Sequence, residues 1–569
     1  MCLFVHTLEL YSVLRNNINQ KEAYLNSGKY EYKRLMPYLV AFLLFVLTIY
    51  LPFHLISYLG NGSNWDEGIA IYGAKRILDG QVLYRDFFDI VTPFTDYIVA
   101  IAYWFFGTSL KVARLTIVIA NGLAVVILWF TSLRIIKNKF MMFIPSVIMI
   151  GYSSRYFSVS HHWFALDGII LTLFLTIKCT LDDHRINVKW IIPGIATAFV
   201  FLTMQSTGLA LYGMLVIFIA WYFRYRDGSL KDAAKSFGYL SMGFFVPVLF
   251  VFVLFYLAGA LNPMLYDLFI WPWGHYTMTN NASYIKQIIY YPVMFKSVEL
   301  ILIHIFADYI FVFIVMLTGI AFLIKDINPI KTPHRDDTTI MTVTVILIAG
   351  FASTMINPTG NLFIFYLPLD ILFIIILIEN YLTNRRLSKG ILFTCLFLLS
   401  LVTVYESARY YRGTDNFIHS SYCVKEQMFA GMIAFPQLPN KSPMQKIEPD
   451  VLSLVEVFDG HFPKKVFILY WSPMFYFLSG AENPTMLNTY TPCYNTKAQA
   501  EIVIRQLEKS KPHYVILDNY LTLLKYQPYR NINSCVFDTA QNIILQWIIT
   551  HYVFKQAVPS YTIYVRKRL

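Results

Sequence analysis

Long apolar runs recur along the first 405 residues of this chain and constrain its fold more than any other feature. A membrane-spanning helix needs about 20 apolar residues at a rise of 1.5 Å each. Charged residues make up only 14% of the 569 residues, whereas soluble domains average about 25%. We therefore predict a polytopic α-helical membrane protein with eleven spans, or thirteen if a hairpin is hidden. The predicted spans are 36–59, 111–134, 140–157, 163–181, 190–203, 207–223, 234–258, 300–325, 340–357, 361–381 and 389–405.

Basic residues cluster between the apolar runs and predict the orientation of the chain. Lys and Arg are enriched in cytoplasmic loops, and every cluster falls on that side if residues 93–107 lie along the outer interface instead of crossing. The N-terminal segment 1–35 is then cytoplasmic, while loop 60–110 and tail 406–569 lie outside a cytoplasmic (inner) membrane. The net charge of +12 thus reflects topology. Nucleic-acid binding is not expected, because the bases are not gathered on one soluble face.

The tail after residue 406 differs in texture from the predicted membrane domain, residues 36–405. Short apolar runs alternate with amphipathic segments, which indicates a small α/β domain. Cys423, Cys493 and Cys535 lie in it, so one disulfide there is conceivable, but the spacing does not assign a pair. The predicted strands are 464–471, 513–517 and 561–566, and the predicted helices are 498–511 and 541–553.

Two adjacent carboxylates, Asp66 and Glu67, follow the first span directly. Ionisable groups beside a membrane span usually serve a site or meet a cation. A structural alternative is that they charge the first turn of the amphipathic run 69–78, where the helix dipole favours acidic residues. The sequence alone leaves both interpretations open.

The order of motifs around this loop resembles the GT-C membrane glycosyltransferases, in the group of protein O-mannosyltransferases and lipid A aminoarabinose transferases. The resemblance covers nearly the whole chain, and each motif is weak by itself. The motifs are Asp66-Glu67, the helix 69–78, Gly80 to Tyr84, Pro93 through Phe106-Gly107, Arg114, Ser160 to Asp167, Phe201 to Gln205, Asn357-Pro358, Pro368 and Glu482 to Thr485.

The resemblance implies transfer of a sugar from a polyprenyl-phosphate carrier, with the leading Asp66 as the catalytic residue and Glu67 beside it. A carboxylate within hydrogen-bond reach can take the proton of an attacking hydroxyl. Such a step inverts the anomeric carbon and needs no covalent intermediate, unlike retaining hydrolases. The expected partners are the bilayer, the lipid-linked donor and an unknown lipid, glycan or protein acceptor.

The leaving lipid phosphate needs cationic or donating groups at the outer interface. Each candidate also has a structural interpretation: Arg85 as a snorkelling anchor, His161 and His162 as helix-end polarity, and His275 as part of an aromatic belt. The candidates for phosphate binding are Arg85, Arg155, His161, His162 and His275, and those for supporting the cavity are Asp89, Asp167, Gln205 and Asn357.

No metal ligand is assigned and no cofactor is certain. An Asp-Glu pair is able to hold Mg²⁺ or Mn²⁺, but no second ligand cluster at fixed spacing supports this. A secondary transporter or lipid flippase is the alternative function for a chain with a dozen spans. Transporters usually carry inverted repeats and charges at mid-membrane, whereas the charges here lie at the outer ends of spans, which favours the enzyme.

Overall fold

The computed structural model describes the helical bundle and much of the tail. The predicted spans 300–325 and 389–405 lie outside the described residues, as do Cys423, Cys493 and Cys535. The described residues are 28–53, 67–155, 158–181, 187–226, 230–272, 335–354, 366–381, 458, 464–469, 473–490, 495–518, 539–558 and 561–567.

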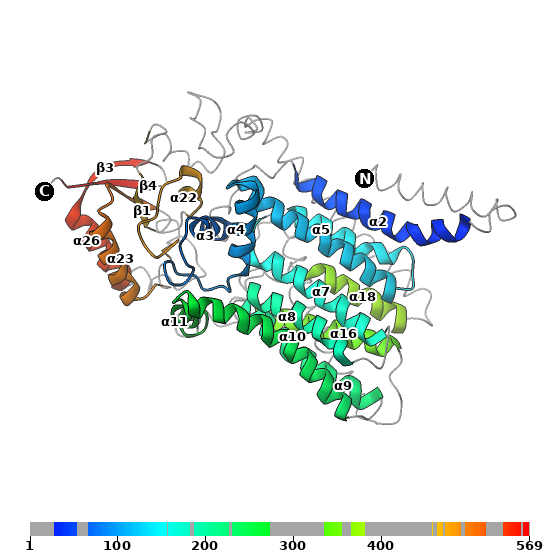
Figure 1. Cartoon of the computed structure of the whole chain (residues 1–569). Helices are drawn as coiled ribbons and strands as arrows, with labels where there is room; N and C mark the ends of the chain where they lie inside the picture. Colours follow the sequence, from blue (N-terminus) through cyan, green and yellow to red (C-terminus); the bar gives the residue numbers. More distant parts are fainter. Residues whose placement is uncertain are drawn as a thin grey trace.

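Apolar helices lie side by side in one bundle (Figure 1). Within the described residues, five helices are long and apolar enough to cross a membrane, and the predicted class of polytopic helical membrane protein is confirmed. The number of spans stays a prediction. The bundle helices are α2 (Gly28–Phe53), α5 (Leu110–Ile135), α6 (Ile144–Arg155), α7 (His161–Leu181), α8 (Ile191–Thr203), α9 (Gln205–Arg226), α10 (Leu230–Leu257), α16 (Arg335–Thr354) and α18 (Leu367–Tyr381).

Helices α8 and α10 approach each other through two glycines. A Cβ on Gly194 would lie 2.3 Å from the carbonyl oxygen of Leu240, and one on Gly243 would lie 2.2 Å from that of Ile191. Small residues at such a crossing allow two backbones to meet where lipid gives no hydrophobic driving force. The contact fixes α8, which at 13 residues is shorter than the roughly 20 that a span needs.

Helices α3 (Gly68–Leu78) and α4 (Phe94–Phe106) pack together at one end of the bundle. With 13 residues, α4 is about 20 Å long, well short of the roughly 30 Å hydrocarbon core. Its last turn exposes Trp104, Phe105 and Phe106, and aromatic residues are typical of the membrane interface. That residues 93–107 lie along the outer interface without crossing stays a prediction.

The C-terminal domain contains one four-stranded sheet of order β1-β2-β4-β3, with β1 and β2 parallel and the other pairs antiparallel. The three predicted strands and two predicted helices are confirmed, whereas α22 and β3 were not predicted. The elements are β1 (Val466–Leu469), α22 (Pro473–Ser479), α23 (Lys497–Ser510), β2 (Tyr514–Asp518), α26 (Thr539–His551), β3 (Tyr552–Val558) and β4 (Tyr561–Arg566).

The boundary between α26 and β3 shows why one strand was missed. The apolar run continues from helix to strand without a loop, so its periodicity carried the predicted helix to Val553. By contrast, the start of α23 has a clear sequence signal, because Thr496 and Gln499 form a reciprocal capping box.

The C-terminal domain lies at the same end of the bundle as α3 and α4 (Figure 1). Helix α22 packs on α3, and the backbone N–H of Phe88 donates to the carbonyl oxygen of Met486 at 2.9 Å. The Tyr72 and Tyr476 rings stack with centroids 5.2 Å apart. The domain and the loop between α3 and α4 therefore form one structural unit.

Candidate functional site

A buried ion pair fixes the start of α3. Arg114 donates through Nε to Oε1 of Glu67 at 2.8 Å and through Nη2 to Oε2 at 2.6 Å, and the two side chains are 2% and 1% exposed. The backbone N–H of Val159 also donates to Oε1, at 3.1 Å. One carboxylate thus joins α3, α5 and the segment before α7. Because both oxygens already accept charge-assisted hydrogen bonds, this geometry suits Glu67 for positioning better than for proton transfer.

Tyr103 of α4 adds a buried hydroxyl near this ion pair. The residue is 2% exposed, lies within electrostatic range of Glu67 and Arg114, and stacks on Phe477 with ring centroids 6.0 Å apart. Its hydroxyl has no hydrogen-bond partner among the described residues. Tyr103 was not predicted as a site residue, because it lies in an apolar aromatic run.

His161 and His162 start α7, two and three residues after Val159. Their ring centroids lie 4.1 Å apart, and the N–H of His162 donates to Oγ of Ser160 at 3.2 Å. The structure therefore brings this predicted pair to the end of the bundle that holds Glu67. Arg155 ends α6, and only its backbone is described.

A second polar cluster lies where the loop returns from α3 to α4. The Gln205 amide donates to the carbonyl oxygens of Ile90 at 2.7 Å and Leu268 at 3.4 Å. Gln205 thereby links Ile90, which follows Asp89, to Leu268, which follows Asp267. The N–H of Asp89 donates to the Asp267 carboxylate. The structure thus brings Gln205, Asp89 and Asp267 together, and the supporting roles of Gln205 and Asp89 stay predictions.

Asp267 lies in a π-helical turn after α10, outside the membrane-spanning segments, and the sequence did not single it out. It is 4% exposed, and its Oδ2 has no hydrogen-bond partner among the described residues. Burial, with the nearby Asp89 charge, raises its pKa from 3.8 to about 8. At neutral pH this carboxyl is therefore largely protonated and can donate a hydrogen bond.

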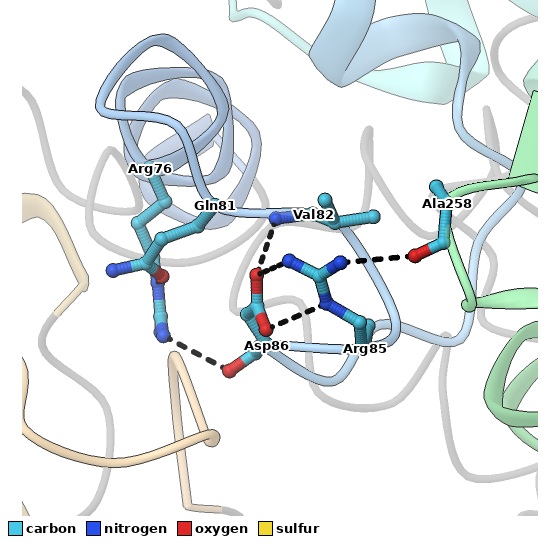
Figure 2. Close-up of polar contacts among 6 residues, drawn as sticks. All are labelled: Arg76, Gln81, Val82, Arg85, Asp86 and Ala258. Atoms are coloured by element: carbon cyan, nitrogen blue, oxygen red, sulfur yellow. Dashed lines mark hydrogen bonds and ion pairs between the residues drawn. The ribbon is translucent and has the colours of Figure 1, made fainter.

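Arg85 is bound to its neighbours in sequence and space, as Figure 2 shows. Its guanidinium donates to the Asp86 carboxylate through Nε at 3.0 Å and Nη2 at 2.8 Å, and to the carbonyl oxygen of Ala258 at 2.9 Å. The hydrogen bond raises the pKa of Arg85 and lowers that of Asp86. A lipid phosphate would have to compete with Asp86 for this cation.

Asp167 lies in the second turn of α7, half-buried within the bundle. With its amide oriented to donate, Asn121 of α5 has its nitrogen 3.3 Å from both Asp167 oxygens. This contact gives the carboxylate a hydrogen-bond donor inside the bundle, and the supporting role of Asp167 stays a prediction. Asp66, His275 and Asn357 lie outside the described residues, so their predicted roles stay predictions.

Within the described part of the chain, no group of three His, Cys, Asp or Glu side chains has the geometry of a metal site. No protein-family model and no curated protein matches the sequence. Solved structures do match. ArnT from Cupriavidus metallidurans, bound to undecaprenyl phosphate, aligns over 93% of this chain and 97% of its own, with a TM-score of 0.52 and 12% identity. The chain has the GT-C fold.

Archaeal AglB from Archaeoglobus fulgidus, in complex with an inhibitory peptide and dolichol-phosphate, aligns over 94% of this chain and 75% of its own, with a TM-score of 0.47 and 13% identity. The ArnT alignment covers enough of this chain to include both the bundle and the C-terminal domain. The predicted resemblance to the GT-C group is thus confirmed at the level of the fold.

Proposed function

We propose that this protein transfers a sugar from a polyprenyl-phosphate carrier to a hydroxyl acceptor, with inversion at the anomeric carbon and Asp66 as the base. The buried Glu67–Arg114 ion pair is the observation that best supports a functional site beside Asp66. A buried pair is costly to desolvate and stabilises little by itself. Its presence beside Asp66 is explained if the chain at this point must be held in one position.

The ligand in the ArnT structure adds to the proposal. That protein is bound to undecaprenyl phosphate, which is the product that remains when a sugar leaves a polyprenyl-phosphate donor. We therefore infer a lipid-phosphate carrier for this chain as well. The carrier would reach the loop from the outer leaflet, in keeping with the predicted orientation.

The proposed reaction assigns one task to each group of residues. Asp66 takes the proton of the acceptor hydroxyl as oxygen attacks the anomeric carbon, and the lipid phosphate departs from the opposite face. His161 and His162 are the proposed phosphate contacts that lie at the Glu67 end of the bundle; Arg85, Arg155 and His275 are further candidates. Glu67 positions the loop, and Asp89, Asp167 and Gln205 support its surroundings.

Replacing Asp66 with Asn tests the proposal. The amide keeps the size of the side chain but cannot accept a proton, so transfer from a labelled lipid carrier in detergent should fall about 100-fold or more. Asp79→Asn is the matched control. It makes the same change on a 52% exposed side chain of the predicted external loop 60–110, which also contains Asp66. Equal activity of the Asp66→Asn and unaltered proteins would remove Asp66 as the base.

A further inference from the structure

We propose that Arg76 is a positioning residue through which the C-terminal domain sets the conformation of residues 79–93, here called the return loop. The catalytic meaning of this role rests on the function proposed above. The return loop begins at the end of α3 and carries Asp89. Its geometry therefore bears on the polar cluster of Asp89, Asp267 and Gln205.

Arg76 contacts both structural parts at once. Its Nε donates to Oε1 of Gln81 at 2.7 Å, and its Nη2 lies 3.4 Å from the carbonyl oxygen of Asp86, both in the return loop (Figure 2). From the same guanidinium, Nη1 donates to Oδ1 of Asn488 at 2.7 Å and Nη2 to the carbonyl oxygen of Thr485 at 3.2 Å. One side chain thus binds two turns that are separated by about 400 residues in sequence.

The environment of Arg76 is unusual for a cation. The residue is 4% exposed, and the four hydrogen bonds described above all go to neutral oxygens. Its guanidinium carbon lies 4.6 Å from the centroid of the Phe87 ring, where a cation–π contact offsets part of the desolvation cost. Such a buried charge contributes little net stability. Its effect is instead to hold the groups that it binds in the one arrangement that fits its planar guanidinium.

The C-terminal side of this contact is itself rigid. Asn483 donates through Nδ2 to the carbonyl oxygen of Leu487 at 2.6 Å, and accepts through Oδ1 from Thr485 at 2.8 Å. The N–H of Met486 donates to Gln506 of α23 at 2.8 Å. The segment 483–488 is therefore fastened to the core of its domain before it meets Arg76.

The return loop, which Arg76 binds together with the C-terminal domain, has a strained backbone at one residue. Tyr84 has a φ of 68°, a left-handed conformation that bulky residues rarely adopt. Its hydroxyl donates to the carbonyl oxygen of Val91 at 2.7 Å, and its N–H donates to that of Phe87 at 2.8 Å. The N–H of Phe88, next to Asp89, donates to Met486. Positive φ persists when the surroundings impose it, and Arg76 with segment 483–488 supplies those surroundings.

The experiment compares Arg76→Ala, Arg76→Lys and Asn488→Ala with the control Lys75→Ala in the purified full-length protein. Lys75 neighbours Arg76 on α3, and its Nζ binds Asp79, the exposed first residue of the return loop, so residue 79 is left out of the comparison between variants. Hydrogen exchange is measured first, because it does not depend on activity. We expect exchange in residues 79–93 and 483–488 to rise about tenfold or more in Arg76→Ala and in Arg76→Lys, while α5 and α7 stay protected.

Kinetics of sugar transfer provide the second measurement. A misplaced loop should lower kcat by about 100-fold, with KM for the donor changing less, and Arg76→Lys should not restore it because a lysine lacks the planar fork. Unchanged exchange in the two segments, or faster exchange with unchanged kcat, would overturn the role of Arg76. If Arg76→Ala does not fold, both measurements are made on Asn488→Ala, since this change removes only one hydrogen-bond acceptor of Arg76. An inactive unaltered protein would contradict the proposed function instead, and exchange would still decide the contact.

Discussion

At the scale of single residues, buried ionisable side chains distinguish this end of the bundle. Glu67 and Arg114 form a bidentate pair, Arg76 is buried among neutral acceptors, and Asp267 keeps one oxygen without a described partner. Buried charges destabilise a fold unless they are paired or hydrogen-bonded. Their concentration around one loop is typical of a functional site, where geometry takes precedence over stability.

The Glu67–Arg114 pair should be sensitive to loss of one partner only. Glu67→Ala leaves Arg114 buried and uncompensated, which should cost about 3–5 kcal/mol and lower Tm in detergent. The double variant Glu67→Leu with Arg114→Met removes both charges and should recover most of the loss. A single variant as stable as the unaltered protein would contradict the geometry described here.

Asp267 should make stability depend on pH. Its folded pKa of about 8 lies above its usual value of 3.8, so the folded state holds a proton that the unfolded chain releases. The sign follows from linkage: stability falls as pH rises from about 4 through about 8. Asp267→Asn removes this dependence. The Tm of the variant minus the Tm of the unaltered protein should therefore be larger at pH 8 than at pH 5. An equal difference at both pH values would contradict the raised pKa.

At the scale of elements, close backbone approach explains how short helices join the bundle. Gly243→Ala would place a methyl group 2.2 Å from the carbonyl oxygen of Ile191, so α8 and α10 must separate. We expect a loss of about 1–3 kcal/mol, measured as a lower Tm. Gly238→Ala on the same helix meets no atom within 4 Å and should leave Tm unchanged or raise it. Equal effects of the two substitutions would argue against the α8–α10 contact.

The sequence predicted elements better than it predicted contacts. Strands and helices of the C-terminal domain were predicted from periodicity, and the capping box of Thr496 and Gln499 in the structure agrees with the start of α23. Arg76 was missed because a basic residue on an amphipathic helix resembles a solvated one, and its partner Asn488 is 412 residues away. Likewise, Gln205 was expected near the site from a motif, but its bonds to Ile90 and Leu268 depend on tertiary packing.

At the scale of the whole molecule, the loop between α3 and α4 and the C-terminal domain share one end of the bundle, and the turn after α5 lies beyond its far end. The N–H groups of Lys137 and Asn138 in that turn donate to Glu379 of α18 at 2.8 and 2.7 Å. The ion pair to Glu67 fixes the start of α3 near the other end of α5. These two regions should therefore face opposite sides of the membrane.

Cysteine labelling in intact cells tests this orientation. On a background without the six native cysteines, Asp79→Cys should react with an impermeant thiol reagent and Lys139→Cys should react only after permeabilisation. Both residues are exposed on the protein surface, so burial does not hide either one. Labelling of Lys139→Cys from outside would reverse the predicted orientation and would make residues 93–107 a span.

Inverting sugar transfer by this protein is tested most directly by product analysis with purified protein, a polyprenyl-phosphate-linked sugar and a hydroxyl acceptor. We expect stoichiometric release of polyprenyl phosphate together with a glycoside whose anomeric configuration is opposite to that of the donor, detected by mass spectrometry and NMR. Retention of configuration would contradict a single displacement with Asp66 as base. Binding of the carrier lipid without any cleavage, across donors of different sugars and acceptors, would contradict the transferase itself.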